Sequence, residues 1–244
     1  MAGPLVLHTA FESLGYLAGA LIYALLRKRR GDPVSDLTRV NVLVGAALGA
    51  ALGSRFLYWL CDPSLTLAHI SDVHYLFGGK TIVGGLLGGW AGVEIAKKRE
   101  GVRTSTGDLF VLPLIVAMSI GRIGCFLAGP IDHTAGLPTS LPWGIAMGDN
   151  IRRHPVALYE IAFLLMLIPI VESVRRRGPN GDAFRVLIGS YLLFRFAVDF
   201  LKPDPPRLIF GVTAIQIVCV VGVAYVAMLL TTEHRQLTAA ASHS

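Results

Sequence analysis

The residues of this sequence most able to do chemistry are ionisable side chains inside apolar segments. Arg55, Arg122 and Arg195 lie late in three such segments, and Glu12 and Glu160 lie early in two others. Each charge costs roughly 2.5–3.5 kcal/mol at the centre of a membrane helix on insertion scales, so it needs a partner or a use. A guanidinium is planar and always charged, which suits it to phosphate. The pattern predicts a shared polar cavity that binds a phospholipid headgroup.

Two interpretations of these charges remain open. In the first, the arginines bind an anionic ligand. In the second, they only form structural ion pairs with the acidic side chains Glu12, Glu160 and Asp199. Arg195 and Asp199 are four residues apart, so a local pair between them is expected.

Cys125 follows Arg122 by three residues, which places both on one helix face. A neighbouring guanidinium favours the thiolate form of a cysteine, and a thiolate is a nucleophile. The alternative is that Cys125 is a small apolar packing residue. The chain has three cysteines and no zinc-binding spacing, so we predict no disulfide framework, no metal and no cofactor.

The elements that must position these residues are membrane helices. The 244 residues are 53% apolar and 16% charged, with a mean hydropathy of +0.60; soluble domains carry about 25% charged residues. This composition excludes a soluble enzyme and a disordered chain. Apolar segments near 20 residues long predict an all-α polytopic protein with seven transmembrane helices. They lie at about 8–26, 41–60, 81–97, 108–128, 156–174, 184–201 and 210–231.

Glycine spacing and loop length add two expectations. The third segment is rich in glycine, which predicts close packing against another helix backbone. The one long connection, 129–155, is expected to form a small extracytoplasmic cap.

The distribution of basic residues predicts the orientation. The net charge is +6, which in an apolar chain indicates contact with anionic lipid and not with nucleic acid. Fourteen Lys and Arg side chains fall on one side of the predicted helices and five on the other. The basic side is cytoplasmic, so the N-terminus is outside and the C-terminus is inside. The charged residues named above then lie in the outer half of the membrane.

Six motifs in order along the chain resemble those of the prolipoprotein diacylglyceryl transferase family. GRIGCF at 121–126 is similar to GRxGNF, and RHP at 153–155 followed by LYE at 158–160 is similar to RHPxxLYE. The remaining four are GGLLG at 84–88, FRF at 194–196 with Asp199, YLAG at 16–19 and AIQ at 214–216.

The resemblance implies a seven-helix enzyme of the bacterial cytoplasmic (inner) membrane with an outer-leaflet site. It implies transfer of the diacylglyceryl group of phosphatidylglycerol, or of another anionic phospholipid, to the lipobox cysteine of a prelipoprotein, with release of glycerol phosphate. The lipid bilayer and the prelipoprotein signal peptide are the implied partners. Arg122 and Arg195 match positions that hold the headgroup. The candidate substrate-binding set is Arg122, Arg195, Arg55, Arg153, Tyr159, Glu160, Asp199, Gly84, Gly85 and Cys125.

The sequence departs from the family motifs where protons are handled. Val83 stands where the family has a histidine, and Cys125, Ala128 and Pro130 replace two asparagines and a glutamate. We therefore take Glu12, expected to be buried, as the candidate base.

His154 is a second catalytic candidate, although its place before a proline at a helix start suits a structural role equally well. The changed residues leave two further functions open: transfer to a different acceptor, and binding of phospholipid without catalysis.

Overall fold

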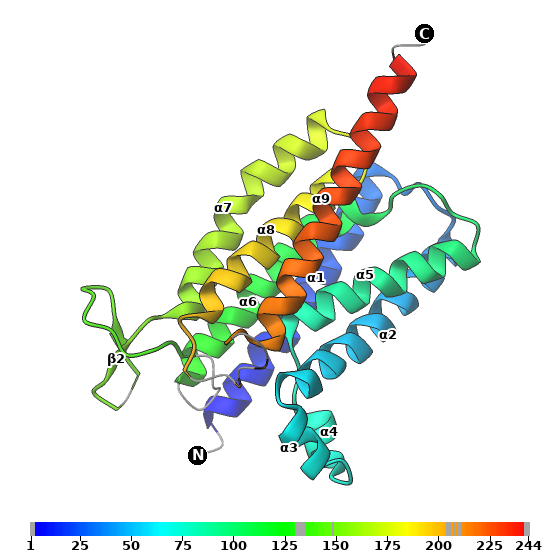
Figure 1. The fold of residues 1–244 in the computed structure, drawn as a ribbon. Coiled ribbons are helices and arrows are strands. Elements are labelled where there is room, and N and C mark those ends of the chain that lie inside the picture. Colours follow the sequence, from blue (N-terminus) through cyan, green and yellow to red (C-terminus); the bar gives the residue numbers. More distant parts are fainter. Residues whose placement is uncertain are drawn as a thin grey trace. The chain divides into compact units, whose positions relative to one another are not determined.

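The computed structural model describes residues 3–129, 135–147, 149–203, 206, 208 and 211–241, and Pro130 lies outside these ranges. The elements, shown in Figure 1, are α1 (Gly3–Arg30), α2 (Asp36–Cys61), α3 (Pro63–Ala68), α4 (Val73–Gly78), α5 (Ile82–Arg99), the 3₁₀ turn η1 (Gly107–Phe110), α6 (Val111–Ala128), β1 (Ile145–Ala146), β2 (Arg152–Arg153), α7 (Val156–Arg177), α8 (Asp182–Asp199) and α9 (Ala214–Ala241).

Long helices occupy the predicted apolar ranges. Five helical segments in the described part of the chain are long and apolar enough to cross a membrane. They are Val6–Arg30, Asp36–Cys61, Gly107–Ala128, Val156–Arg177 and Ala214–Thr232. The all-α polytopic membrane class is therefore confirmed. Helices α5 and α8 have 18 residues each and are not among the five.

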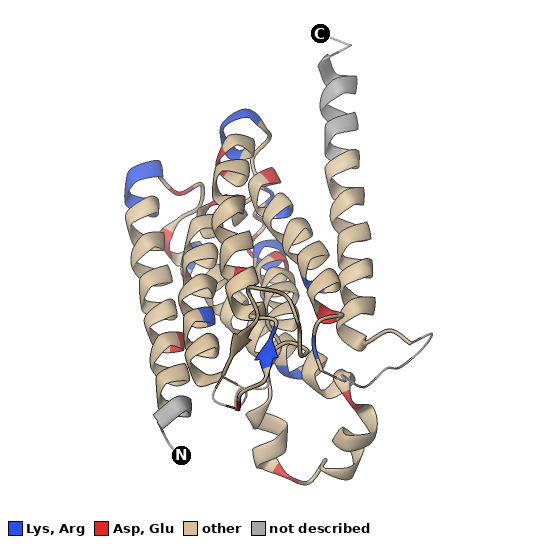
Figure 2. Ribbon diagram, turned by 90° about the vertical axis from the view of Figure 1, so that its left-hand side faces the viewer, with Lys and Arg blue, Asp and Glu red and all other residues tan. Residues whose placement is uncertain are grey.

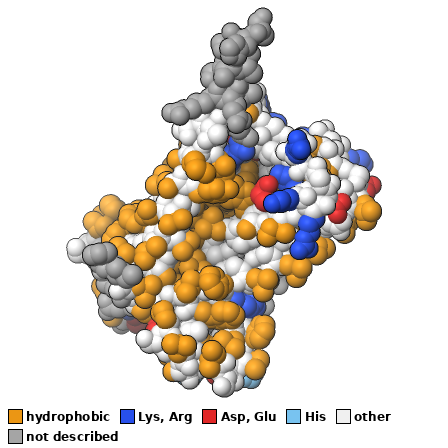
Figure 3. All heavy atoms as spheres, turned by 45° about the vertical axis from the view of Figure 1, so that its right-hand side comes forward, with side chains coloured by type: hydrophobic (Ala, Val, Ile, Leu, Met, Phe, Trp, Pro, Cys, Tyr) orange, Lys and Arg blue, Asp and Glu red, His pale blue; other side chains and the backbone are white. Residues whose placement is uncertain are grey.

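Large apolar side chains are exposed along these helices, as a lipid-facing surface requires. Leu52 of α2 is 71% exposed, Met166 of α7 65% and Val221 of α9 64%. Hydrophobic side chains cover much of the face shown in Figure 3. In water such a surface would drive aggregation, whereas acyl chains solvate it.

The chain divides into two compact units. The first contains α1, η1, α6, both strands, α7 and the two ends of α8; the second contains α2 to α5, the middle of α8 and α9. In the first unit α6 contacts both α1 and α7. A Cβ atom added at Gly15 of α1 would lie 2.6 Å from the carbonyl oxygen of Ala117, so glycine lets these two helices approach closely.

The second unit is organised around α2 and α5. Three glycines on each helix, spaced four residues apart, face one another: Gly45 with Gly92, Gly49 with Gly88, and Gly53 with Gly84. A Cβ atom at any of them would collide with the opposite backbone. The close backbone approach expected for the glycine-rich segment is present, and its partner is α2.

The chain between α2 and α5 is also structured, although the sequence suggested only one long connection. Asp62 accepts a hydrogen bond from the amide of Leu65 at the start of α3, and Asp72 accepts one from the amide of His74 in α4. Such N-caps stabilise even single helical turns. Residues 62–81 therefore form a folded segment between α2 and α5.

We predict that Gly88→Ala destabilises the second unit. Its Cβ would meet the backbone of α2 at Gly49 and Gly53, and overpacking of this kind typically costs about 1–3 kcal/mol. Gly85→Ala is the matched control, because its Cβ would find ordinary contacts at 3.7 and 3.9 Å. Thermal unfolding in detergent should show a lower Tm for Gly88→Ala alone; equal Tm values would contradict the packing.

Candidate functional site

Two buried charges of the first unit form an ion pair between two helices. Arg122 Nε of α6 lies 2.9 Å from Glu160 Oε1 of α7. The two side chains are only 10% and 1% exposed. A charge buried in a low-dielectric environment is tolerated when it is paired. The pair therefore joins α6 to α7 and holds a guanidinium in an apolar surrounding.

Cys125 contacts the same guanidinium. Arg122 Nη1 donates to Cys125 Sγ at 3.5 Å, and Cys125 is buried one helical turn beyond Arg122. The expectation that the two residues share a helix face is confirmed. Because Cys125 is buried beside the ion pair, the contact orients the guanidinium.

Glu12 lies in a ladder of polar side chains along α1. The Tyr16 hydroxyl donates to Glu12 Oε1 at 2.8 Å, and His8 Nε2 lies 3.8 Å from Glu12 Oε2. The Glu12 side chain is 23% exposed, so the expectation of a fully buried carboxylate is wrong. The spacing of four residues places all three groups on one helix face, where two neighbours orient the carboxylate.

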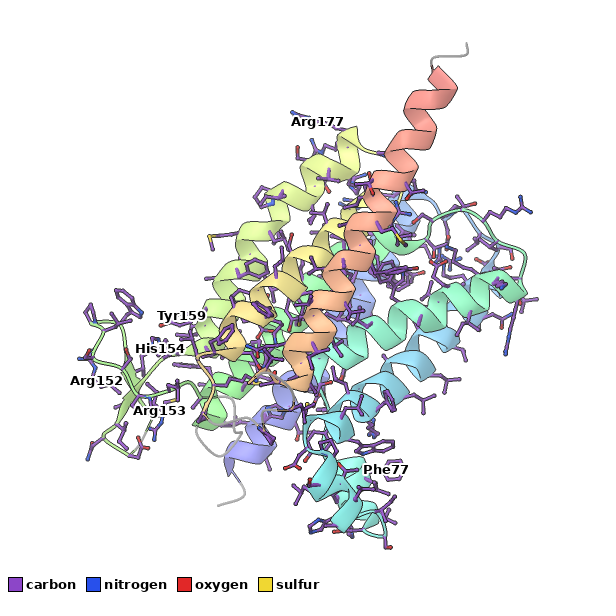
Figure 4. The ribbon with its side chains drawn as sticks, in the orientation of Figure 1. Phe77, Arg152, Arg153, His154, Tyr159 and Arg177 are labelled. Atoms are coloured by element: carbon purple, nitrogen blue, oxygen red, sulfur yellow. The ribbon has the colours of Figure 1, made fainter. Side chains whose placement is uncertain are left out.

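His154 and Tyr159 meet in the segment between α6 and α7, as Figure 4 shows. His154 Nδ1 lies 3.2 Å from the Tyr159 hydroxyl, which also accepts from Trp143 Nε1 at 2.8 Å. The histidine backbone is engaged as well, because its amide donates to Leu137 and its carbonyl accepts from Gly136. These contacts give His154 and Tyr159 a structural role in holding this segment on the first turn of α7.

The arginines of strand β2 are occupied within the same segment. Arg153 Nη1 lies 2.5 Å from Asp149 Oδ2, and the Arg153 hydrogen bond holds the pKa of that carboxyl below its usual range. Arg152 donates to the carbonyls of Gly144 and Pro142. Arg153, a candidate for headgroup binding, is thus paired locally.

The second unit holds Arg55 and the glycine motif. Arg55 Nη1 donates to the carbonyl of Ala51 at 3.3 Å, and its guanidinium carbon lies 5.6 Å from the ring centre of Phe77 in α4. Val83 is buried. Gly84 packs tightly against the α2 backbone, whereas a Cβ atom at Gly85 would make only ordinary contacts with Ser54 and Ala50. Gly84 of the glycine motif therefore contributes to helix packing, and Gly85 is less tightly packed.

The two charges of α8 are deeply buried. Arg195 is 4% exposed and Asp199, one turn later, is 2% exposed. Both lie near the C-terminal end of α8. Burying ionisable side chains is costly, so the burial of Arg195 and Asp199 supports the interpretation that they have a function.

Two structural partners and one capping motif were not predicted from the sequence. Tyr16 and Trp143 supply the hydroxyl and the indole that hold Glu12 and Tyr159. Tyr16 was detectable, because it follows Glu12 by four residues. Gln216 accepts from the amide of Thr213, and Thr213 Oγ1 accepts from the amide of Gln216. This reciprocal capping box, readable as T-x-x-Q, begins α9.

In the part of the chain that the structure describes, no group of three His, Cys, Asp or Glu side chains could hold a metal ion. The groups that meet at the Arg122 site are a guanidinium, a carboxylate and a thiol.

The fold is that of a polytopic helical membrane protein, and its buried guanidinium–carboxylate pair is a candidate functional site. The particular family follows from comparison with known proteins. Residues 6–232 match the family model described as prolipoprotein diacylglyceryl transferase. The chain belongs to this family, and the resemblance of its motifs is confirmed.

Curated relatives match over most of their length. Three proteins named phosphatidylglycerol–prolipoprotein diacylglyceryl transferase illustrate this. That of Bordetella parapertussis is 33% identical over 83% of this chain and 80% of its own. That of Methylococcus capsulatus is 32% identical over 97% and 95%, and that of Vibrio vulnificus strain YJ016 is 35% identical over 81% and 76%.

We predict that Glu160→Gln strongly destabilises the first unit. The substitution leaves Arg122 buried without its carboxylate, and breaking a buried pair from one side typically costs about 3–5 kcal/mol. Asp149→Asn is the control, because the pair of Asp149 with Arg153 is more exposed and solvent weakens such pairs. Denaturant unfolding in detergent measures both. A loss for Glu160→Gln no larger than that of the control would show that the pair is not structural.

Proposed function

We propose that the protein transfers the diacylglyceryl group of phosphatidylglycerol to the lipobox cysteine of prelipoproteins. Given that the chain belongs to this family, one structural observation supports the proposal. The arginine of the GRIGCF motif and the glutamate of the LYE motif, 38 positions apart in sequence, meet in one buried ion pair. Two family motifs thereby meet at one buried guanidinium–carboxylate pair between α6 and α7.

The proposed setting is the bacterial cytoplasmic membrane, with α5 and α8 as spans beside the five apolar helices. The basic residues at the ends of α1, α5 and α7 support a cytoplasmic position for those ends. The N-terminus, the segment 129–155 as a cap, and the Arg122–Glu160 pair are then on or near the outer side. This orientation presents the pair to an outer-leaflet headgroup.

The reaction requires a cation where negative charge develops. The acceptor thiol loses its proton, and its sulfur attacks the glyceryl carbon that bears the phosphate. A carbon–sulfur bond forms, the carbon–oxygen bond to phosphate breaks, and glycerol phosphate leaves with both electrons of that bond. Arg122, held by Glu160 and Cys125, would stabilise the departing phosphate.

A base must receive the thiol proton, and Glu12 is the group we propose for it. Glu12 is partly exposed, and Tyr16 and His8 fix its orientation. Val83 has no titratable group, so it cannot fill the role of the family histidine. His154 is less suited, because its ring contacts Tyr159 within the segment before α7.

Arg122→Lys should lower transfer at least about 100-fold, because an ammonium keeps the charge opposite Glu160 but loses the planar fork that binds phosphate. The control is Arg185→Lys, since Arg185 forms a comparable pair with Asp182 beyond the other end of α7. Mass spectrometry of a lipobox peptide incubated with phosphatidylglycerol measures the product. Wild-type turnover by Arg122→Lys would remove the phosphate role.

Glu12→Gln should abolish turnover and leave phosphatidylglycerol binding unchanged, because glutamine keeps the hydrogen bond from Tyr16 but accepts no proton. Lipid retained on the purified protein and modified peptide are measured on the same sample. The control Tyr16→Phe keeps the carboxylate and removes one hydrogen bond, so it should retain most of the turnover. Full activity of Glu12→Gln would assign the base elsewhere.

The same assay separates two alternatives that the changed residues Val83, Cys125 and Ala128 favour. Consumption of lipid without peptide modification would indicate a different acceptor. Retention of lipid without consumption would indicate a phospholipid-binding protein that has lost catalysis.

A further inference from the structure

The C-terminal ends of α1 and α7 carry a cluster of arginines that the transfer reaction does not use. Glu172 of α7 is surrounded by three guanidinium groups, and we call these four residues the arginine cluster. Arg175 Nη2 lies 2.6 Å from Glu172 Oε1, Arg176 Nε lies 3.1 Å from the same oxygen, and Arg30 Nη2 of α1 lies 3.6 Å from Oε2. One carboxylate therefore gathers three positive charges from two helices.

The surroundings of the cluster are also basic. Lys28 and Arg29 of α1 and Arg177 of α7 are exposed beside it. Arg27 is paired with Asp32 at 2.6 Å. Figure 2 shows the basic ends of α1 and α7 at the same end of the first unit, and Figure 4 shows Arg177 at the end of α7 opposite Tyr159.

Other carboxylates in this part of the unit have partners outside the cluster, and Asp108 also interacts electrostatically with Arg175. Asp108 accepts from the backbone amides of Gly181 and Phe184, and so caps α8. Asp182 is paired with Arg185 at 2.8 Å. Among the described residues, the seven basic side chains of the two helix ends, 27–30 and 175–177, are partly balanced by ion pairs with Glu172 and Asp32 and by the electrostatic interaction of Arg175 with Asp108. The helix ends therefore keep a large excess of positive charge.

Phospholipid is the anion that fits this position. Apolar side chains are exposed on the turns that precede the basic residues, with Leu25 of α1 at 56%, and Met166 and Ile170 of α7 at 65% and 52%. A headgroup phosphate on the arginines would have its acyl chains beside these residues. Glu172 holds Arg175 through two hydrogen bonds, at 2.8 and 2.6 Å, so this guanidinium is oriented before a lipid arrives.

We propose that the arginine cluster binds the phosphate of an anionic phospholipid in the leaflet opposite the candidate site. In the proposed orientation this is the cytoplasmic leaflet. The site is separate from the reaction and links α1 to α7 through a lipid. It rests on the proposed orientation only for the name of the leaflet, and not on the transfer activity.

The test is lipid-dependent stability of the full chain in detergent. Arg30→Gln/Arg176→Gln removes two charges and leaves Glu172 paired with Arg175. The matched control is Arg99→Gln/Arg103→Gln, which removes two exposed charges from and just after α5 in the second unit. Thermal unfolding is followed while phosphatidylglycerol, phosphatidylcholine or inorganic phosphate is added, and native mass spectrometry counts retained lipid.

We expect phosphatidylglycerol to raise the Tm of the wild type and of the control, with about tenfold weaker apparent affinity in Arg30→Gln/Arg176→Gln. Phosphatidylcholine, with no net charge, should stabilise far less. Equal affinities in both variants, equal effects of the two lipids, or the same stabilisation by inorganic phosphate alone would each overturn the proposal. The single variant Arg176→Gln, at an exposed position, should show a smaller loss and guards against misfolding of the double variant.

Transfer activity is measured separately in excess phosphatidylglycerol, where Arg30→Gln/Arg176→Gln should match the wild type. An inactive wild type that still shows the charge-dependent lipid effect would remove the proposed function and keep the lipid site. An active wild type without the charge-dependent lipid effect would keep the proposed function and remove the lipid site.

Discussion

A charge inside an apolar helix pair must be neutralised nearby, and this constraint governs the first unit. Arg122 can lie in α6 only because Glu160 of α7 is within 2.9 Å. The pair fixes which faces of α6 and α7 meet. The segment between these helices then adds its own contacts to the first turn of α7, through Tyr159 and Trp143. The same interaction that stabilises the fold thus holds the guanidinium to which we assign phosphate binding in the proposed function.

Helix packing without a hydrophobic driving force is the second constraint. Within a bilayer, helices associate through close van der Waals contact, and small residues make that contact possible. In the second unit, the three pairs of facing glycines on α2 and α5, which we call the glycine ladder, allow this close contact. Gly15 allows it between α1 and α6. Some residues that resemble a substrate-binding motif, Gly84 among them, are explained by this packing alone.

Regular patterns were predictable from the sequence, and tertiary contacts were not. Hydropathy located the long helices, and spacing by three or four residues correctly placed Arg122 with Cys125. The pairing of Arg122 with Glu160 was one of several possible combinations of three arginines with three acids. The partial exposure of Glu12 and the bonding of Tyr159 to Trp143 depend on neighbours that sequence spacing does not specify. Helices α3 and α4 escaped prediction because single capped turns have no hydrophobic period.

The glycine ladder also bears on how the chain enters the membrane. Helix α5 contains five glycines and falls outside the helices apolar enough to span by themselves. Helix α2 is synthesised first and presents the complementary groove of Gly45, Gly49 and Gly53. As a proposed span, α5 would gain during insertion from a partner already in the bilayer. The two helices would then enter as a hairpin, with α3 and α4 translocated between them, and the order of synthesis would contribute to the topology.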